Sequence, residues 1–420
     1  GFWIARIFDH RQTRSLGGMV FILLCAKNSR RLILMGRFLR LFFLRLIKPW
    51  THPRMKSSIE RKRTAFIVDL LRSPAAILAR RSRNLRVCIT YRCNLSCSYC
   101  YARGLSQHMP MDMTRDDFLQ LVAWAKQNCI LEIFFMGGEP TIHPQFEEFL
   151  EICYRHRLFV TVVTNGLFNP SLMAKLDRFW MLGLVINNAY ADGKDRHGLF
   201  HDNLRQLRQR NIPFGLVHIL GFKDMQEEQV YEDIQVFGPR YVSITLSIPG
   251  YSKQTSATEI LAHKDDLFRR VVKMQGFCAA QGIPVFIVRP LLLCMFDASQ
   301  LKQLKQTFDF ALHFRCHLGY GKESITVNPD LSIFPCPVVF LRGPSLLTFK
   351  NKRALSEYYR GRLKEILIKP LHDGCKECSA HKGFVCSLEK STEAKTGNDI
   401  CQGGCLSFRA GNHNFFPPQW

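Results

Sequence analysis

The chain has 420 residues, of which 47% are hydrophobic and 22% charged. A chain of this size and composition can bury a large core, which excludes intrinsically disordered, collagen-like and small disulfide-stapled proteins. The formal net charge is +24, and the first 84 residues alone hold 19 basic and 3 acidic residues. The basicity therefore belongs to an N-terminal extension and says little about what the rest of the chain binds.

Residues 1–84 are interpreted as a basic, amphipathic helical extension. On a helical wheel of residues 30–48, the basic side chains gather on one side and Leu, Ile, Met and Phe fill the rest; the basic residues are Arg30, Arg37, Arg40, Arg45 and Lys48. This pattern predicts an interfacial helix on an anionic membrane surface. A helix packed on the main domain, or sequence that is not native, explains it equally well. No uncharged stretch reaches the roughly 18 residues of a membrane span, so we expect a cytoplasmic protein, peripheral at most to the inner face of the membrane.

From residue 85 onward, short β-rich runs alternate with amphipathic segments. We expect strands at 85–90, 131–138, 158–166, 182–188, 213–220, 240–247 and 284–291, and helices at 114–127, 144–156, 169–178, 202–211, 226–236 and 258–281. Strands separated by helices of this length form β-α crossovers and a parallel sheet. The predicted fold class is α/β, a partial (β/α)6 barrel of the TIM type over 85–300, with its chemistry at the carboxyl ends of the strands.

After about residue 310 the alternation stops. Residues 325–334 predict a hairpin around Asn328-Pro329-Asp330, and residues 351–368 predict a helix with one apolar face. The last 50 residues hold five cysteines and few apolar runs. A segment so poor in hydrophobic periodicity cannot form a sufficient core and needs another stabilising element, which ligated metal would provide. We therefore expect a small cysteine-rich domain over 301–420.

Three cysteines form the motif with the greatest chemical content. Cys93, Cys97 and Cys100 follow the first predicted strand with the spacing C-x-x-x-C-x-x-C. With 16 cysteines in the chain, this triple spacing is expected roughly 0.02 times by chance. Three thiolates are one fewer than a closed tetrahedral site requires. They would hold a 4Fe-4S cluster and leave one iron open to a substrate or cofactor.

Two further motifs end the second and third predicted strands. The second strand ends in Gly137-Gly138-Glu139-Pro140, where glycines let the backbone approach a ligand and a carboxylate can meet an ammonium group. The third strand ends in Thr164-Asn165-Gly166. Taken alone, each sequence is more typical of an ordinary turn.

The chain resembles the radical S-adenosylmethionine (radical SAM) family, and residues 93–100 and 137–140 carry the resemblance. It covers about residues 85–300, and a weaker likeness continues to about residue 410. The resemblance implies that the three cysteines hold the cluster, whose open iron binds S-adenosylmethionine. It implies that Gly137 to Pro140 hold the amino group, that Tyr99 lies beside the adenine, and that Thr164 and Asn165 contact the sugar. Electron transfer would then cleave the cofactor, and the 5′-deoxyadenosyl radical would abstract a substrate hydrogen. Where relatives often carry Ser-x-Asp-Gly, this chain has Tyr190-Ala191-Asp192-Gly193, which puts the serine contact in doubt.

Seven cysteines behind the barrel resemble the SPASM extension, which carries auxiliary iron–sulfur clusters: Cys316, Cys336, Cys375, Cys378, Cys386, Cys401 and Cys405. The resemblance implies two auxiliary clusters, or one cluster in a twitch-type extension. The fit departs at Leu331, where the family usually has glycine, and no eighth cysteine follows Cys405. Zinc held by four of these thiolates is the alternative.

The leading hypothesis is a radical SAM enzyme that abstracts hydrogen from a peptide or small metabolite. It would receive electrons from an external donor such as flavodoxin or ferredoxin. The alternative is a non-enzymatic iron–sulfur electron carrier or a zinc-stabilised binding module on the same barrel. A nucleic-acid partner is not expected. His143, His197, His201 and His218 receive no catalytic role, because histidines near strand ends are more often satisfied or solvated, and no other catalytic residue is assigned.

Overall fold

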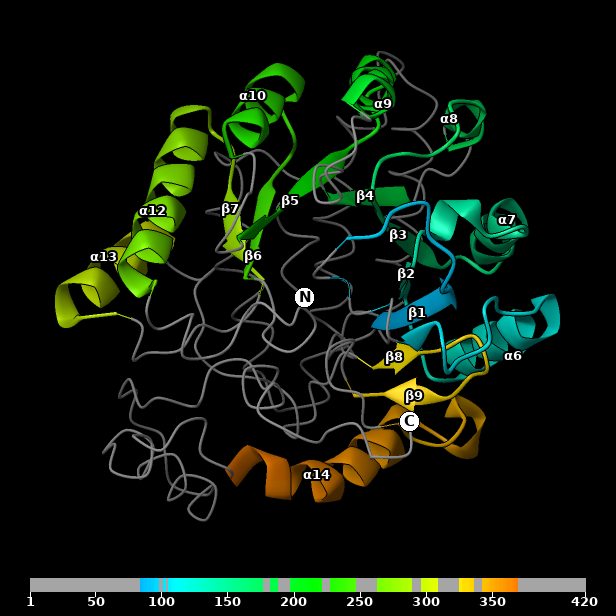
Figure 1. The fold of residues 1–420 in the computed structure, drawn as a ribbon. Helices are drawn as coiled ribbons and strands as arrows, with labels where there is room; N and C mark the ends of the chain where they lie inside the picture. Colours follow the sequence, from blue (N-terminus) through cyan, green and yellow to red (C-terminus); the bar gives the residue numbers. More distant parts are fainter. Residues whose placement is uncertain are drawn as a thin grey trace, which may run out of the picture. The chain divides into compact units, whose positions relative to one another are not determined.

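A computed structural model of the chain (Figure 1) describes residues 84–97, 100, 102, 105–176, 182–187, 197–220, 227–246, 263–288, 296–308, 325–335 and 342–368. All of them belong to one compact unit, Asn84–Trp420. The basic segment 30–48 lies outside these residues, and so do Tyr99, residues 190–193 and the seven cysteines from Cys316 to Cys405.

A nine-stranded sheet runs through the described residues in the order β7-β6-β5-β4-β3-β2-β1-β8-β9. All neighbours are parallel except β8 and β9, which form an antiparallel hairpin. Strands β1 to β7 follow one another around an arc, with helices α6 to α13 on its outer side (Figure 1). The strands are β1 Asn84–Thr90, β2 Glu132–Gly137, β3 Phe159–Thr164, β4 Leu182–Asn187, β5 Phe214–Leu220, β6 Val242–Leu246, β7 Val285–Ile287, β8 Thr326–Val327 and β9 Ile333–Phe334.

Helices follow the strands in turn, which confirms the predicted β-α alternation and the α/β fold class. Helix α9 begins five residues before its predicted start, and α13 was not predicted. In the described residues the helices are α6 Arg115–Gln127, η2 Pro140–Ile142, α7 Phe146–Arg155, α8 Ser171–Leu176, α9 His197–Gln209, α10 Glu227–Phe237, α12 Lys264–Ala280, α13 Ala298–Phe308, η6 Leu346–Thr348 and α14 Lys352–Ile368. None of them is long and apolar enough to cross a membrane.

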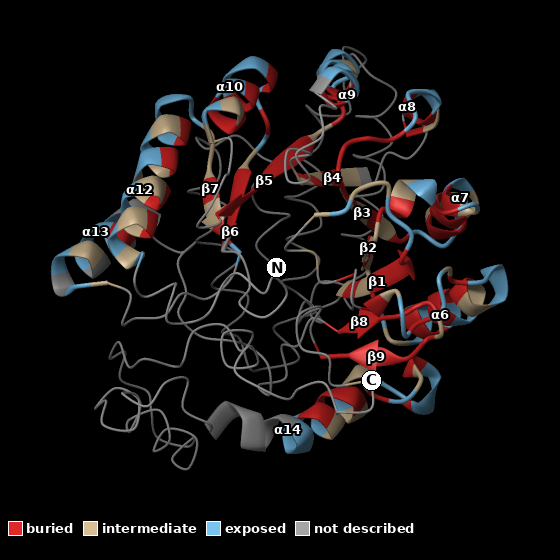
Figure 2. Cartoon of the chain, in the orientation of Figure 1, coloured by how far each residue is buried: buried red, intermediate tan, exposed pale blue. Residues whose placement is uncertain are grey.

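The main core lies between the strands and the helices, because alternate strand residues point to opposite faces of the sheet. On α6, α7, α10 and α12 the buried residues face the strands, and the outer faces are exposed (Figure 2). Phe118 of α6 stacks on Phe149 of α7 with ring centroids 4.0 Å apart, and Phe135 of β2 meets Phe118 edge-on. These contacts fix the first two β-α units, which carry the motif residues at their strand ends.

The β8–β9 hairpin extends the sheet beyond β1, on the side away from β2. The sequence predicts this hairpin but not its pairing. β8 runs parallel to β1, with Arg86 opposite Thr326 and Val87 opposite Val327. The hairpin therefore borders the strand from which the three-cysteine loop starts.

Candidate functional site

The turn after β2 packs its backbone directly on the end of β1. The amide of Gly138 donates to the Thr90 carbonyl (2.8 Å), and the amide of Glu139 donates to the Arg92 carbonyl (2.7 Å). A Cβ on Gly137, whose φ is +123°, would lie 2.1 Å from the Thr90 oxygen, and one on Gly138 would lie 2.0 Å from the Arg92 oxygen. No side chain fits at such distances. Both glycines are therefore required to bring this turn against the residues just before Cys93.

The Glu139 carboxylate joins the turn after β2 to the end of β3. The side chain is buried, with 1% of the residue exposed. Its Oε1 accepts hydrogen bonds from the Thr141 amide (3.1 Å), the Thr141 hydroxyl (2.6 Å) and the Thr164 hydroxyl (2.8 Å). Its Oε2 accepts from the Asn165 amide (2.7 Å). Burial raises the pKa of Glu139, and these four donors oppose that effect.

Asn165 extends this network to the cysteine loop. Its Nδ2 donates to Oδ1 of Asn94 (2.6 Å), and its Oδ1 accepts from the Leu167 amide (2.9 Å). Asn94 is the residue after Cys93, and its own Nδ2 donates to the Leu167 carbonyl (3.3 Å). Both ends of the Asn165 amide group are thus engaged within the protein. The Asn165 oxygen keeps a second lone pair, so the sugar contact that the family resemblance implies can be made without breaking these bonds.

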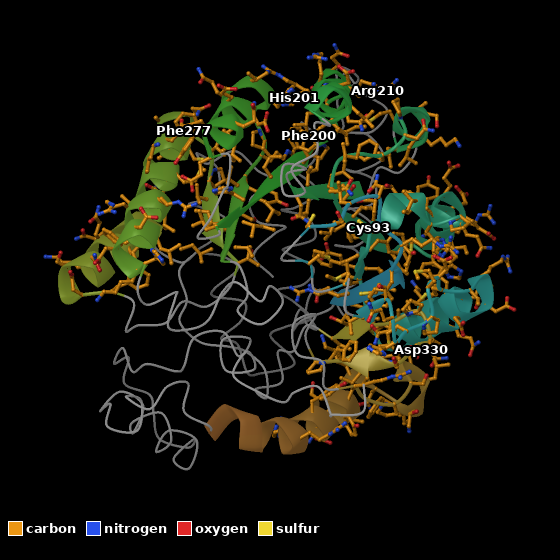
Figure 3. The ribbon with its side chains drawn as sticks, viewed as in Figure 1. Cys93, Phe200, His201, Arg210, Phe277 and Asp330 are labelled. Atoms are coloured by element: carbon orange, nitrogen blue, oxygen red, sulfur yellow. The ribbon has the colours of Figure 1, made fainter. Side chains whose placement is uncertain are left out.

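The loop holds the three cysteines near these groups. Cys93, labelled in Figure 3, is exposed. Cys97 and Cys100 are partly buried. The Cys100 amide donates to the Cys97 carbonyl (3.2 Å), and the Leu95 amide donates to the Cys93 sulfur (3.4 Å). Desolvation by the surrounding atoms raises the pKa of the Cys93 thiol to about 11, and the negative charges of Glu139 and Cys100 add to this effect. The raised pKa favours the neutral thiol at neutral pH.

The donor set fits a cluster better than a single ion. Within the described residues, no three Cys, His, Asp or Glu side chains are grouped so that they could hold one metal ion. A four-iron cluster binds each thiolate through a different iron, so its ligands need not converge on one point. Three thiols on a short, accessible loop satisfy that requirement.

Sequence reasoning assigned no role to two of the connecting residues. Asn94 lies within the cysteine motif, and Thr141 follows the Gly-Gly-Glu-Pro turn. The only sequence signal for Asn94 and Thr141 is that they lie beside motif residues. The hydrogen bonds that Asn94 makes join segments far apart in the sequence, and no local pattern indicates those bonds. The described residues place Gly137, Gly138, Glu139, Thr164 and Asn165 together next to the cysteine loop, as predicted for one edge of the sheet.

His143 and His201 make hydrogen bonds or polar contacts within the protein. His143 is buried; its Nδ1 accepts from the Gln145 amide (3.0 Å), and its Nε2 lies 3.1 Å from the Met113 carbonyl. His201 on α9 (Figure 3) contacts the buried Asp233 of α10 at 2.8 Å. These contacts join helices and loops.

Comparison with known proteins identifies the barrel. Residues 87–237 match the family model described as "Radical SAM superfamily". This part of the chain belongs to the radical SAM superfamily. The match starts within β1 and ends with α10, so it contains all the motif residues from Cys93 to Asn165.

Among curated relatives, this chain is 32% identical over 117 residues to the probable GTP 3′,8-cyclase of Methanocella arvoryzae, covering 28% of this chain and 36% of the relative. It is 27% identical over 117 residues to the PqqA peptide cyclase of Methylorubrum extorquens, covering 28% of each chain. The chain thus matches about a third of the length of these relatives.

A solved structure extends the likeness of the fold. Streptococcus suis SuiB, solved with S-adenosylmethionine and with its precursor peptide SuiA, matches with TM-scores of 0.52 and 0.53 at 14% sequence identity. The two matches cover 87% and 91% of this chain and 88% and 92% of SuiB. At this identity the comparison establishes the fold alone, a partial barrel of the radical SAM type.

Proposed function

We propose that this chain is a radical SAM enzyme that reductively cleaves S-adenosylmethionine and abstracts a hydrogen atom from its substrate. The observation that carries the proposal is the direct connection of the cysteine loop to the Gly-Gly-Glu turn. Glu139 holds the Asn165 backbone, and Asn165 holds Asn94 beside Cys93. An electron carrier or a zinc module needs the cysteines but has no use for this second site.

In this proposal, Cys93, Cys97 and Cys100 hold the 4Fe-4S cluster. When bound, the cluster supplies the electron that cleaves S-adenosylmethionine to a 5′-deoxyadenosyl radical. The protein's part is to fix the three thiols, to bind the cofactor beside them, and to limit access of water and oxygen to the site.

The cofactor's amino group would lie at Gly137 to Pro140. The Gly138 and Glu139 amides are already bonded to the end of β1, so the turn presents carbonyl oxygens, which accept from an ammonium group. The buried Glu139 charge adds a negative potential, because all of its hydrogen-bond donors are neutral groups. Thr164 and Asn165 would border the sugar and Tyr99 the adenine.

The test is the formation of 5′-deoxyadenosine by anaerobically reconstituted, reduced protein. Replacing Cys93, Cys97 and Cys100 by Ala should abolish it. Cys129→Ala is the matched control, because Cys129 is an exposed thiol just after α6, outside the loop. The proposal fails if the triple variant still forms 5′-deoxyadenosine, or if the wild-type protein loaded with iron forms none.

For residues 301–420 we propose an auxiliary iron–sulfur domain of the SPASM or twitch type, ligated by cysteines from Cys316 to Cys405. Iron analysis distinguishes the arrangements, since three four-iron clusters give about 12 irons per chain and two give about 8. The triple Cys→Ala variant should lower either number by about 4. Stoichiometric zinc with about 4 irons would contradict both auxiliary-cluster arrangements.

We further propose a peptide substrate, supported by the match to a PqqA peptide cyclase and by the fold of SuiB, a protein solved with its precursor peptide. The match to a probable GTP 3′,8-cyclase supports a small molecule as the second candidate. A gene for a short peptide beside this one would favour the first, and genes for sugar or lipid biosynthesis the second. An external donor such as flavodoxin or ferredoxin would supply the electron in either case.

A further inference from the structure

The β8–β9 hairpin makes a buried polar contact just ahead of the cysteine loop. The Tyr91 hydroxyl donates to Oδ1 of Asn328 at 2.7 Å. Asn328 is fully buried and Tyr91 is 4% exposed, although 237 residues separate them in the chain. Tyr91 lies two residues before Cys93, so this bond attaches the start of the loop to the hairpin.

The acceptor in this contact is itself held firmly. Nδ2 of Asn328 donates to the Ser332 carbonyl and hydroxyl, both at 3.1 Å. The Ser332 hydroxyl donates to Oδ1 of Asp330 (2.6 Å), and Arg342 pairs with the same carboxylate (Figure 3 labels Asp330). Because both Nδ2 bonds fix the orientation of the amide, Oδ1 faces Tyr91 in one defined direction.

Phe334 of β9 provides a second contact, which is apolar. It is 1% exposed and lies in a small hydrophobic cluster separate from the main core. Cys100 and Met136 pack against this cluster. Its members come from β1, from both flanks of the cysteine loop and from the hairpin: Cys88, Tyr91, Ala102, Leu105, Met109 and Phe334.

We propose that the β8–β9 hairpin positions the three-cysteine loop, with Tyr91, Asn328 and Phe334 as positioning residues. The hydrogen bond to Asn328 fixes the loop before Cys93, and the packing of Phe334 fixes it around and after Cys100. Metal ligands bind well only when surrounding groups hold them in the required arrangement. The hairpin would thus keep the thiols presented for binding. Only the identity of the bound group, a 4Fe-4S cluster, rests on the proposed function.

The chain offers a matched pair of variants. Tyr91→Phe removes the hydroxyl that bonds to Asn328. Tyr359→Phe removes an equivalent buried hydroxyl, which donates to the Ile333 carbonyl, also at 2.7 Å, on the α14 side of the same hairpin. Both variants remove one buried hydrogen bond, but the Ile333 carbonyl keeps the Gly343 amide as a donor (2.8 Å), so Tyr359→Phe should lose no more thermal stability than Tyr91→Phe. Only Tyr91→Phe should affect the loop.

The measurement is amide hydrogen exchange of residues 91–105 in the metal-free, full-length protein. We expect Tyr91→Phe to exchange these amides about tenfold faster, because the substitution leaves the buried Oδ1 of Asn328 without its Tyr91 donor. Phe334→Leu, which keeps most of the apolar volume, should accelerate the amides after Cys100. Exchange in Tyr91→Phe no faster than in Tyr359→Phe would overturn the proposal.

Iron release to a chelator from reconstituted protein is the second readout. Release from the three-cysteine site should be several-fold faster in Tyr91→Phe than in Tyr359→Phe, because a looser loop holds its ligands less well. If the wild-type loop binds no iron but Tyr91→Phe still loosens it, the hairpin's role stands and the cluster assignment fails. Unchanged iron release in Tyr91→Phe, in a wild type that does bind the cluster, would contradict the role in binding.

Discussion

At the scale of single residues, Glu139 has the most demanding environment near the site. Moving a carboxylate out of water costs several kcal/mol, and charge-assisted hydrogen bonds return about 1.5–3 kcal/mol each. Four donors are therefore enough to offset the loss of hydration. In the ionised form of Glu139, both carboxylate oxygens act only as acceptors. In the protonated form, one of the oxygens would also be a donor. The four donors thus favour the carboxylate form and oppose burial, which raises the pKa of the group.

Glu139→Gln should lower the free energy of unfolding by about 2–4 kcal/mol. Each oxygen accepts one backbone amide, Oε1 from Thr141 and Oε2 from Asn165. Whichever oxygen becomes an NH₂ group, one backbone amide loses its acceptor. Urea unfolding at neutral pH measures the change.

Glu132→Gln is the control, because Glu132 begins β2, the strand that precedes Glu139, and accepts from one hydroxyl, that of Thr161 (2.8 Å). That hydroxyl can turn to accept from the new amide, so the change should stay within about 0.5 kcal/mol. Equal effects of the two substitutions would mean that the Glu139 network contributes nothing specific.

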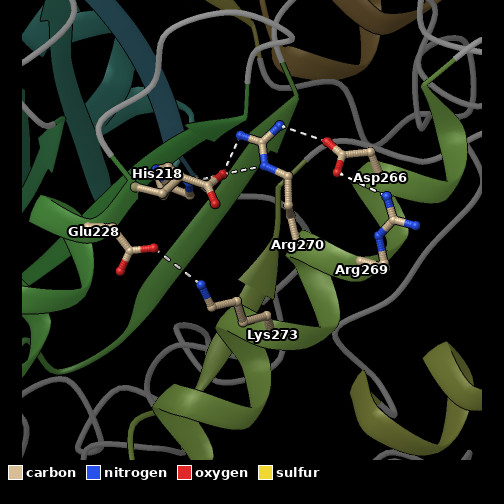
Figure 4. Close-up of polar contacts among 7 residues, drawn as sticks. His218, Glu228, Asp266, Arg269, Arg270 and Lys273 are labelled. Atoms are coloured by element: carbon tan, nitrogen blue, oxygen red, sulfur yellow. Dashed lines mark hydrogen bonds and ion pairs between the residues drawn. The ribbon is translucent and has the colours of Figure 1, made fainter.

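A second carboxylate near charged neighbours is that of Glu227, which is partly buried and contacts Arg270 and His218, both labelled in Figure 4. Glu227, the first residue of α10, pairs with Arg270 of α12, which also lies 3.6 Å from Asp266. Nε2 of the buried His218 is 3.6 Å from the Glu227 carboxylate. Burial alone would raise the pKa of Glu227, but the neighbouring His218 and Arg270 lower it to about 2.

This shift predicts a pH-dependent effect of Glu227→Gln. A carboxylate whose pKa is depressed on folding stabilises the native state fully above its unfolded pKa, near 4.5, and loses that contribution as the pH falls toward 2. The variant should therefore be less stable than wild type by about 1.5–3 kcal/mol at pH 7. The difference should shrink steadily below pH 4.5 in urea titrations.

Glu228→Gln is the control for this experiment. Glu228 is 83% exposed and pairs with Lys273 at 3.3 Å (Figure 4). Exposed ion pairs contribute at most about 1 kcal/mol because water screens them. A deficit in Glu227→Gln that stayed constant from pH 7 to pH 3 would show that lost packing, not charge, causes it.

At the scale of elements, local pattern predicts the strands well and their long-range pairing poorly. The apolar runs of β1 to β6 are long enough to be recognised, because each strand buries at least one face against the core. β7 has only three residues, and α13 has no clear boundary signal in the sequence. The hairpin is encoded by Asn328-Pro329-Asp330, but nothing near Thr326 indicates that β8 pairs with β1, 240 residues earlier.

The hairpin also explains one departure from the SPASM pattern. Leu331, at the position where that family usually has glycine, has φ +61° and is 4% exposed. A left-handed conformation costs a non-glycine residue on the order of 1–2 kcal/mol. Burying a leucine side chain contributes about 1.5–3 kcal/mol, so in this chain the side chain outweighs the strain.

Leu331→Gly should therefore destabilise the protein by about 1–2 kcal/mol, although it relieves the backbone. Arg157→Gly is the control, because Arg157 has φ +56° but is exposed. Glycine at position 157 relieves the backbone strain and removes little buried surface, so the stability of the protein should rise by up to about 1 kcal/mol. Thermal unfolding of both variants measures the two effects, and a stabilised Leu331→Gly protein would contradict this account.

At the scale of the whole molecule, the sequence predicts which residues form the site better than how they are held. Cys93, Gly137 and Thr164 are recognisable because Gly137 and Thr164 end strands and Cys93 comes shortly after one, and parallel strands bring their carboxyl ends to one edge. The bonds that fix them, Asn165 to Asn94 and Tyr91 to Asn328, join residues 71 and 237 positions apart. Such pairings depend on strand order and register, and no local pattern records them.

The last prediction concerns the basic segment 30–48, which lies outside the described residues. Basic side chains near an anionic surface contribute about 1 kcal/mol each, and salt screens this attraction. The full chain should therefore float with anionic liposomes at low salt and dissociate as salt rises. A chain beginning at Thr64 should not float.

Nucleic acid would give a similar salt dependence, so an RNA gel shift runs in parallel. A membrane would bury the apolar face of the segment, whereas RNA would leave it in water at a cost in free energy. Phe38→Ser with Phe42→Ser preserves the charge but should abolish flotation. RNA binding would survive that change, because it depends on the basic side chains alone. Flotation that is equal for the full and shortened chains would contradict the interfacial helix and favour a segment packed against the protein.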